Sequence, residues 1–72
     1  MDRLTLMQTF VAVAEEEGFA PAARRLGVSP PVVTRSISAL EEHLGARLLE
    51  RTTRKVRVTE AGARYLGDCK RL

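Results

Sequence analysis

Residues 29 to 45 read SPPVVTRSISALEEHLG and predict one helix with well-defined ends. Ser29 suits the N-cap, because its hydroxyl can accept a hydrogen bond from an unpaired N–H of the first turn. Pro30 suits the first helical position, where an amide donor is not needed. Gly45 suits the left-handed residue just past the last turn. We therefore expect a helix over residues 30–44.

The two sides of this helix differ in chemistry. An apolar stripe at helical spacing predicts its buried side: Val33, Ile37, Leu40 and Leu44. The opposite side is small, hydroxyl-bearing and cationic, and carries Val32, Thr34, Arg35 and Ser38. Acids come only toward the C-terminal end, at Glu41 and Glu42. Arg, Ser and Thr contact base edges and phosphates in the DNA major groove, so this face favours DNA binding.

Composition restricts the class of protein. The 72 residues have room for one small domain, and an apolar content of 44% is ordinary for a globular chain. The net charge of +3 and the pI of about 9.8 favour an anionic partner. Cys69 is the single cysteine, so no internal disulfide can form, and a reducing cytoplasm is expected. No apolar run is long enough to cross a membrane, and we expect no membrane association.

Two shorter helices are expected before the central one. The first covers residues 4–16, and its predicted apolar face is Leu4, Met7, Phe10, Val11 and Ala14. Three acids, residues 15–17, should form a solvated end, followed by Gly18 and a core anchor at Phe19. Pro21 should begin a second helix that reaches about Leu26, with Ala22, Ala23 and Leu26 inward. Two helices joined by a short Gly-containing turn predict a helix-turn-helix motif over residues 19–38.

A basic hairpin is expected after Gly45. Residues 46–51 could be a helical turn or the start of a strand, residues 52–55 are turn-like, and residues 56–58 alternate as a half-exposed strand does. Between residues 46 and 58 five basic side chains face one acid, Glu50, which gives a local charge of five minus one, or +4: Arg47, Arg51, Arg54, Lys55 and Arg57. Arg47 and Arg57 could contact DNA or pair with Glu50 or Glu41. For Arg24 and Arg25 a DNA contact and a surface ion pair likewise remain open.

The last segment predicts a helix over residues 60–72. Thr59 can cap it, and Glu60 is favourable near its positive end. One apolar line runs along it and is our candidate dimer interface: Ala61, Tyr65, Leu66, Cys69 and Leu72. Because the pattern stops without a cap, we expect the chain to be a piece of a larger protein.

The order of these motifs resembles a known family. It includes Phe19, AARRLGVS at 22–29, PxVTRxIxALExxLGxxLLxR at 31–51 and VTEAG at 58–62. The string is similar to the N-terminal DNA-binding domain of LysR-type transcriptional regulators. That resemblance implies a mainly α fold, a winged helix-turn-helix at 1–59 with a three-helix core and a small β-hairpin wing, and then the start of a linker helix at 60–72.

The resemblance also implies partners. Such a domain binds double-stranded DNA at a pseudo-palindromic operator, as a homodimer or, at full length, a tetramer, in the bacterial cytoplasm at the nucleoid. It needs no cofactor of its own. A small-molecule effector would bind a C-terminal domain that is absent from this chain.

The expected DNA-binding residues come from the recognition helix and the wing. They are Pro30, Pro31, Val32, Thr34, Arg35 and Ser38 on the helix, and Arg51, Thr52, Thr53, Arg54 and Lys55 in the wing. The chain departs from the family pattern at Pro30, usually Gln, at Ala20, usually a hydroxyl residue, and at Ser38, often basic. These departures place base reading mainly on Thr34, Arg35 and the wing.

Other functions remain open on the residues alone. The basic face could meet an acidic protein, or the domain could bind DNA without sequence preference. Arg35 could contact a phosphate, or pair with an acid on the protein surface, instead of contacting a base. His43 has no Cys or Asp at ligand spacing, no metal or phosphate-cradling motif is present, and we expect neither a metal site nor an enzyme.

Overall fold

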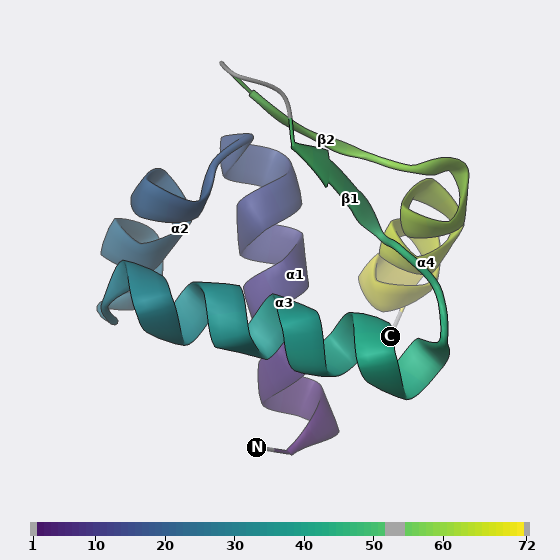
Figure 1. Ribbon diagram of the computed structural model, residues 1–72, viewed down its shortest axis with the longest axis horizontal. Coiled ribbons are helices and arrows are strands. Elements are labelled where there is room, and N and C mark those ends of the chain that lie inside the picture. Colours follow the sequence, from purple (N-terminus) through teal and green to yellow (C-terminus); the bar gives the residue numbers. More distant parts are fainter. Residues whose placement is uncertain (1, 52–54, 72) are drawn as a thin grey trace.

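A computed structural model describes residues 2–51 and 55–71 of the chain, and its elements follow the expected order (Figure 1). They are α1 (Arg3–Glu16), α2 (Phe19–Leu26), α3 (Pro30–Leu44), β1 (Leu49–Arg51), β2 (Val56–Val58) and α4 (Glu60–Arg71). α3 crosses in front of α1, α2 lies beside one end of this pair, and the hairpin and α4 lie on the other side (Figure 1). This mainly α arrangement with a small antiparallel sheet is the expected winged helix-turn-helix. None of the helices in the described ranges is long and apolar enough to span a bilayer.

The central helix begins and ends at the expected residues, but its cap differs. Gly45 adopts φ 67° and ends α3 in the left-handed conformation. Ser29 is the N-cap residue, but its hydroxyl makes no capping hydrogen bond, so that expectation was wrong. The two prolines that follow have no N–H, and the next two donors, Val32 N and Val33 N, bond to the Ser29 carbonyl at 3.1 and 3.4 Å. No amide of this first turn is therefore left to donate to the Ser29 hydroxyl.

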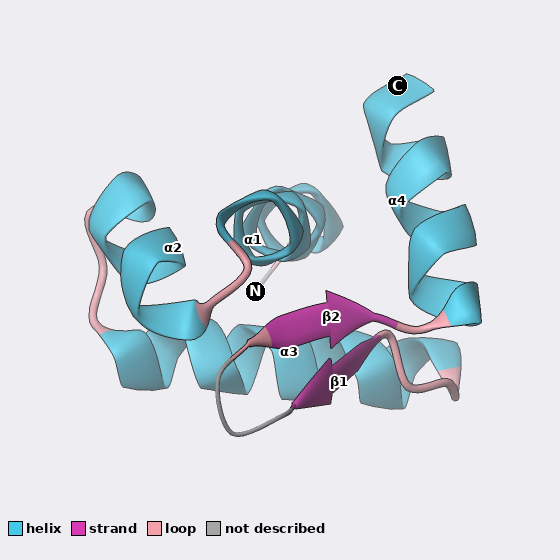
Figure 2. Ribbon diagram, turned by 90° about the horizontal axis from the view of Figure 1, so that it is seen from above, coloured by secondary structure: helices cyan, strands magenta, loops and turns pink. Residues whose placement is uncertain are grey.

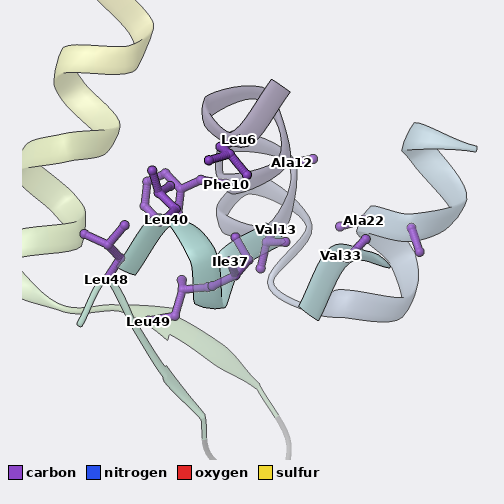
Figure 3. Close-up of a cluster of buried hydrophobic side chains, with 11 residues drawn as sticks. Leu6, Phe10, Ala12, Val13, Ala22, Val33, Ile37, Leu40, Leu48 and Leu49 are labelled. Atoms are coloured by element: carbon purple, nitrogen blue, oxygen red, sulfur yellow. The ribbon is translucent and has the colours of Figure 1, made fainter. Parts of the chain in front are cut away.

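The core lies between α1, α2, α3 and the start of the hairpin (Figure 3). Fully buried side chains from these elements fill it: Phe10, Val13, Ala22, Ala23, Val33, Ile37, Leu40, Leu48 and Leu49. Leu44 was expected there and is 40% exposed instead. Because the chain turns back after Gly45, Leu48 and Leu49 complete the core at this end of α3 (Figure 3). Ser36 is buried on the same helix, and its hydroxyl donates to the Val32 carbonyl at 2.8 Å.

The buried side of α1 is not the predicted one. Leu4 is 63% exposed, whereas the helix buries Leu6, Thr9, Phe10, Ala12 and Val13, so only Phe10 of the predicted face is fully covered. α1 contacts α2, α3 and α4. Because these neighbours cover it from several sides, its buried residues do not follow the single stripe that helical periodicity assumes. The helix ends at Glu17, whose φ of 57° is left-handed. That conformation costs a residue with a side chain about 1–2 kcal/mol.

α2 begins two residues before the expected start. Gly18 is the N-cap residue, and Pro21 lies in the first turn of Phe19–Leu26, where a proline is tolerated. Ala22 and Ala23 are buried as predicted, and their small side chains let α2 approach its neighbours. Phe19 is only partly buried and packs at the edge of the core. Gly27, at φ 72°, makes the turn into α3 and completes the helix-turn-helix.

The hairpin is joined to α4 through Thr59. The strands pair antiparallel, with Leu49 opposite Val58 and Arg51 opposite Val56. The Thr59 hydroxyl accepts from Gly62 N at 3.0 Å, which is the expected cap, and donates to the Arg47 carbonyl at 2.6 Å. Thr59 N also donates to the Leu48 carbonyl at 2.9 Å. These bonds fix the start of α4 against the segment that leads into β1.

Candidate nucleic-acid interface

The exposed side of α3 carries the residues expected to meet DNA. Pro31, Arg35 and Ser38 are exposed at helical spacing, and Thr34 beside them is half-buried. The Thr34 hydroxyl donates to the Pro30 carbonyl at 3.3 Å, which leaves its oxygen able to accept a further hydrogen bond. Within the described part of the chain, no acid pairs with Arg35. Its guanidinium is therefore available to an external acceptor.

The two remaining expected positions of the helix differ in exposure. Pro30 is exposed at the first turn. Val32 is half-buried and lines a shallow hollow of about 280 Å³ beside α1, together with Leu26, Val28 and Ser36. Part of the Val32 side chain therefore faces its own protein, and less of it is available to a partner.

A second hollow, of about 300 Å³, separates α3 from the wing. Its lining includes Ser38 from α3 and two cations, Arg47 and Arg51, from the segment after it. The Arg51 guanidinium carbon lies 4.5 Å from the centre of the Phe19 ring, a cation–π contact that stacks β1 on the start of α2. Sequence reasoning did not anticipate this pair, since nothing local connects residues 19 and 51. The stacking holds Arg51, one cation of the wing, on the side of the hollow opposite α3.

Glu41 sets the spacing between α3 and β1. One of its carboxylate oxygens accepts from Leu48 N at 2.8 Å and from Leu49 N at 3.2 Å. Among the described residues neither Arg47 nor Arg57 pairs with Glu41 or Glu50, so the alternative of an ion pair there was wrong. The Glu41 carboxylate is bound by backbone donors, so the guanidinium groups of Arg47 and Arg57 stay available to an external acceptor.

The wing and α3 lie on the same side of the molecule, while α4 leads away from it. Seen from above, the hairpin and α3 are at the bottom, and the C-terminal end of α4 is at the top (Figure 2). Arg51 and Lys55 are exposed at the inner ends of the hairpin loop. Lys55 Nζ is 3.9 Å from Glu17 Oε1. Thr52, Thr53 and Arg54 lie outside the described residues.

The acidic end of α1 is paired rather than simply solvated. Arg25 lies 2.8 Å from Glu15 and 3.4 Å from Glu16, and Lys70 lies 3.4 Å from Glu15. The hydrogen bond from Arg25, and then that from Lys70, lowers the pKa of the Glu15 carboxyl, and Glu15 in turn raises the pKa of Arg25. Arg25 is therefore a structural cation, whereas Arg24 is exposed and has no acidic partner among the described residues.

The candidate dimer residues partly face their own protomer. Tyr65, Leu66 and Cys69 are partly buried against the core, and the rings of Tyr65 and Phe10 are 5.5 Å apart at 55°. Desolvation raises the pKa of both the Tyr65 phenol and the Cys69 thiol. Ala61 is half-buried, and Leu72 lies outside the described residues. Their role between two copies stays a prediction.

Comparison with known proteins gives consistent matches. A family model described as a bacterial regulatory helix-turn-helix protein of the lysR family matches residues 4–63. The regulator TfdS of Cupriavidus pinatubonensis is 53% identical over 66 residues, 92% of this chain and 22% of that protein. ClcR of Pseudomonas putida is 52% identical over the same length, with the same two shares. The chain thus spans about a fifth of the length of these curated relatives.

Solved structures match over almost the whole chain. The crystal structure of a CbnR_DBD–DNA complex has a TM-score of 0.92 and 45% identity, and the match covers 99% of this chain and 80% of that one. A BenM_DBD/catB site 1 DNA complex also has a TM-score of 0.92, with 39% identity and shares of 99% and 79%. Fold, motif order and sequence identity agree, and the chain belongs to the LysR family of bacterial regulatory helix-turn-helix proteins.

Proposed function

We propose that this domain binds double-stranded DNA with sequence preference, as the DNA-reading part of a transcription regulator. One observation carries the proposal: the start of α3 is exposed and free of acids, and the cations Arg47 and Arg51 line the hollow between α3 and the hairpin. The ribbons of α3 and the hairpin lie on one side of the molecule (Figure 2). α3 would enter the major groove, which is wide enough for a helix. The DNA complexes of the similar CbnR and BenM domains support this assignment.

The proposed roles follow from the chemistry of each side chain. Arg35 would read a base, because an arginine can bond to both acceptors of guanine. Thr34 and Ser38 would bond to phosphate or to a base edge, and Pro31 would give apolar contact. Backbone phosphates would be met by Arg47 and the wing, namely Arg51, Thr52, Thr53, Arg54 and Lys55.

The oligomer and the effector belong to the same proposal. Contacts through α4 would make a dimer, through Ala61, Tyr65, Leu66, Cys69 and Leu72, and longer forms would assemble as tetramers. Two copies of α3 would then meet half-sites about 34 Å apart, or a multiple of it, on a pseudo-palindromic operator. A small-molecule effector would act through a further domain, and binding to the chromosome would place the protein at the bacterial nucleoid. We expect no enzymatic activity and no cofactor in this domain.

The experiment is selection of bound duplexes from a random pool, followed by affinity measurement on the enriched and on unrelated sequences. Arg35→Ala should bring these two affinities closer, by about 1–3 kcal/mol of lost discrimination. Arg64→Ala is the control, because it removes the same charge from an exposed position on α4. A pool without enrichment would show binding without sequence preference. Absence of duplex binding even at low salt would contradict the proposal and favour an acidic protein partner.

A further inference from the structure

The end of α1 differs from the ends of α2 and α3. Those two helices end in left-handed glycines, Gly27 and Gly45, whereas α1 ends in left-handed Glu17. Glu17 is the one residue other than glycine with positive φ in the described part of the chain. A side chain is disfavoured in that conformation, and such backbone outliers cluster at functional sites.

Glu17 contacts the base of the wing twice. Its carbonyl accepts from Val56 N, the first residue of β2, at 3.4 Å. Its carboxylate Oε1 lies 3.9 Å from Lys55 Nζ. The neighbouring acids Glu15 and Glu16 face Arg25 instead. Of the three acids at this helix end, Glu17 is therefore the one that pairs with a described residue of the wing.

The ion pair is weak enough to exchange. The side chains of Lys55 and Glu17 are 59% and 57% exposed, so water and salt screen their attraction. A DNA phosphate can then compete with the carboxylate for the ammonium group. Any duplex that engages Lys55 must displace Glu17 or bind with this negative charge nearby.

We propose that Glu17 weakens DNA binding equally for all sequences. Its carboxylate pairs with Lys55 and so lowers the affinity of the wing for every duplex. The inference rests on the proposed function. Because phosphate contacts carry no sequence information, the attenuation lowers preferred and unrelated affinities by the same factor. The effect is that α3 contributes a larger share of the binding free energy.

The experiment measures affinity for a short duplex of mixed sequence over a range of salt concentrations. Glu17→Gln should raise affinity by about two- to fivefold, the range that corresponds to an exposed ion pair. The slope of log affinity against log salt should steepen by about 0.9, the value for one more neutralised phosphate. Glu17→Gly should give the same gain, because it removes the carboxylate and suits the left-handed backbone.

Two controls separate the pair from a general charge effect. Adding Glu17→Gln to Lys55→Gln should leave affinity equal to that of Lys55→Gln alone. Asp68→Asn changes the net charge equally, on α4 next to Arg71, and should not alter binding. The proposed role of Glu17 would be overturned by a gain in affinity that persists without Lys55, by an equal gain from Asp68→Asn, or by no gain at all. Failure of the unaltered chain to bind any duplex would instead contradict the proposed function itself.

Discussion

The carbonyl oxygen of Leu48 occupies the place where a side chain on Gly62 would begin: a Cβ built there would lie 2.0 Å from that oxygen. The first turn of α4 is therefore in direct contact with the backbone that leads from α3 into the wing. Through the same segment Glu41 holds Leu48 and Leu49, and Thr59 holds Arg47. α3 and α4 thus have a fixed relative direction, which would set the geometry of any dimer made through α4.

Gly62→Ala should lower the free energy of unfolding by about 2–3 kcal/mol, because overpacking against backbone forces the two segments apart. Single cores of this size rarely supply more than about 3–5 kcal/mol, so the loss should appear as a large drop in Tm. Gly67→Ala is the control in the same helix. Its Cβ would find its nearest neighbour, an Arg71 nitrogen, at 3.7 Å, and the change should stabilise by about 0.5–1 kcal/mol. Equal effects of the two changes would contradict the close contact.

Glu41→Ala should destabilise the domain by about 2–4 kcal/mol, because the amides of Leu48 and Leu49 lose their common acceptor. Glu41→Gln should cost less, about 1 kcal/mol, since an amide oxygen can still accept both bonds without the charge. Chemical denaturation of both variants tests this ranking. Glu42→Ala, the exposed next residue, should stay within about 0.5 kcal/mol.

Leu40→Ala should cost about 2–5 kcal/mol, because it opens a cavity at a side chain that is only 1% exposed. Leu44→Ala, one helical turn later, should cost less than about 1 kcal/mol, since Leu44 is 40% exposed. Denaturation midpoints at constant m-value measure both. Similar losses at the two positions would show that the apolar stripe continues to the end of α3.

Arg25→Gln should lower Tm at neutral pH, and the difference from the unaltered chain should disappear in acid. The pKa of Glu15 is lowered from 4.5, first by its hydrogen bond with Arg25, so the folded state favours the charged carboxylate. This stability is fully present above pH 4.5 and is lost as the pH falls through the lowered folded-state pKa. Thermal unfolding at a series of pH values measures the gap. Arg24→Gln, exposed and without an acidic partner among the described residues, should show no such pH dependence.

The sequence by itself determined the elements and their order. Pro30, the left-handed Gly27 and Gly45, and the capping hydroxyl of Thr59 act on residues close to them in the chain, so their effects can be predicted locally. For the same reason the bounds of α3, the helix-turn-helix, the hairpin and the exposed position of Arg35 were predicted correctly. Pro21 is the exception, because α2 begins two residues before it. The motif string was also specific enough to indicate the LysR family.

Only the tertiary structure decided which side chains are buried and which residues far apart in the chain are in contact. The true buried side of α1, the exposure of Leu44, the stacking of Phe19 on Arg51 and the pairing of Glu17 with Lys55 depend on residues far apart in the chain. Helical periodicity shows that a face is apolar, but not which neighbours cover it or where they end. Those contacts arise only when the helices and the wing pack around a common core, because long-range packing, rather than local propensity, fixes which atoms meet.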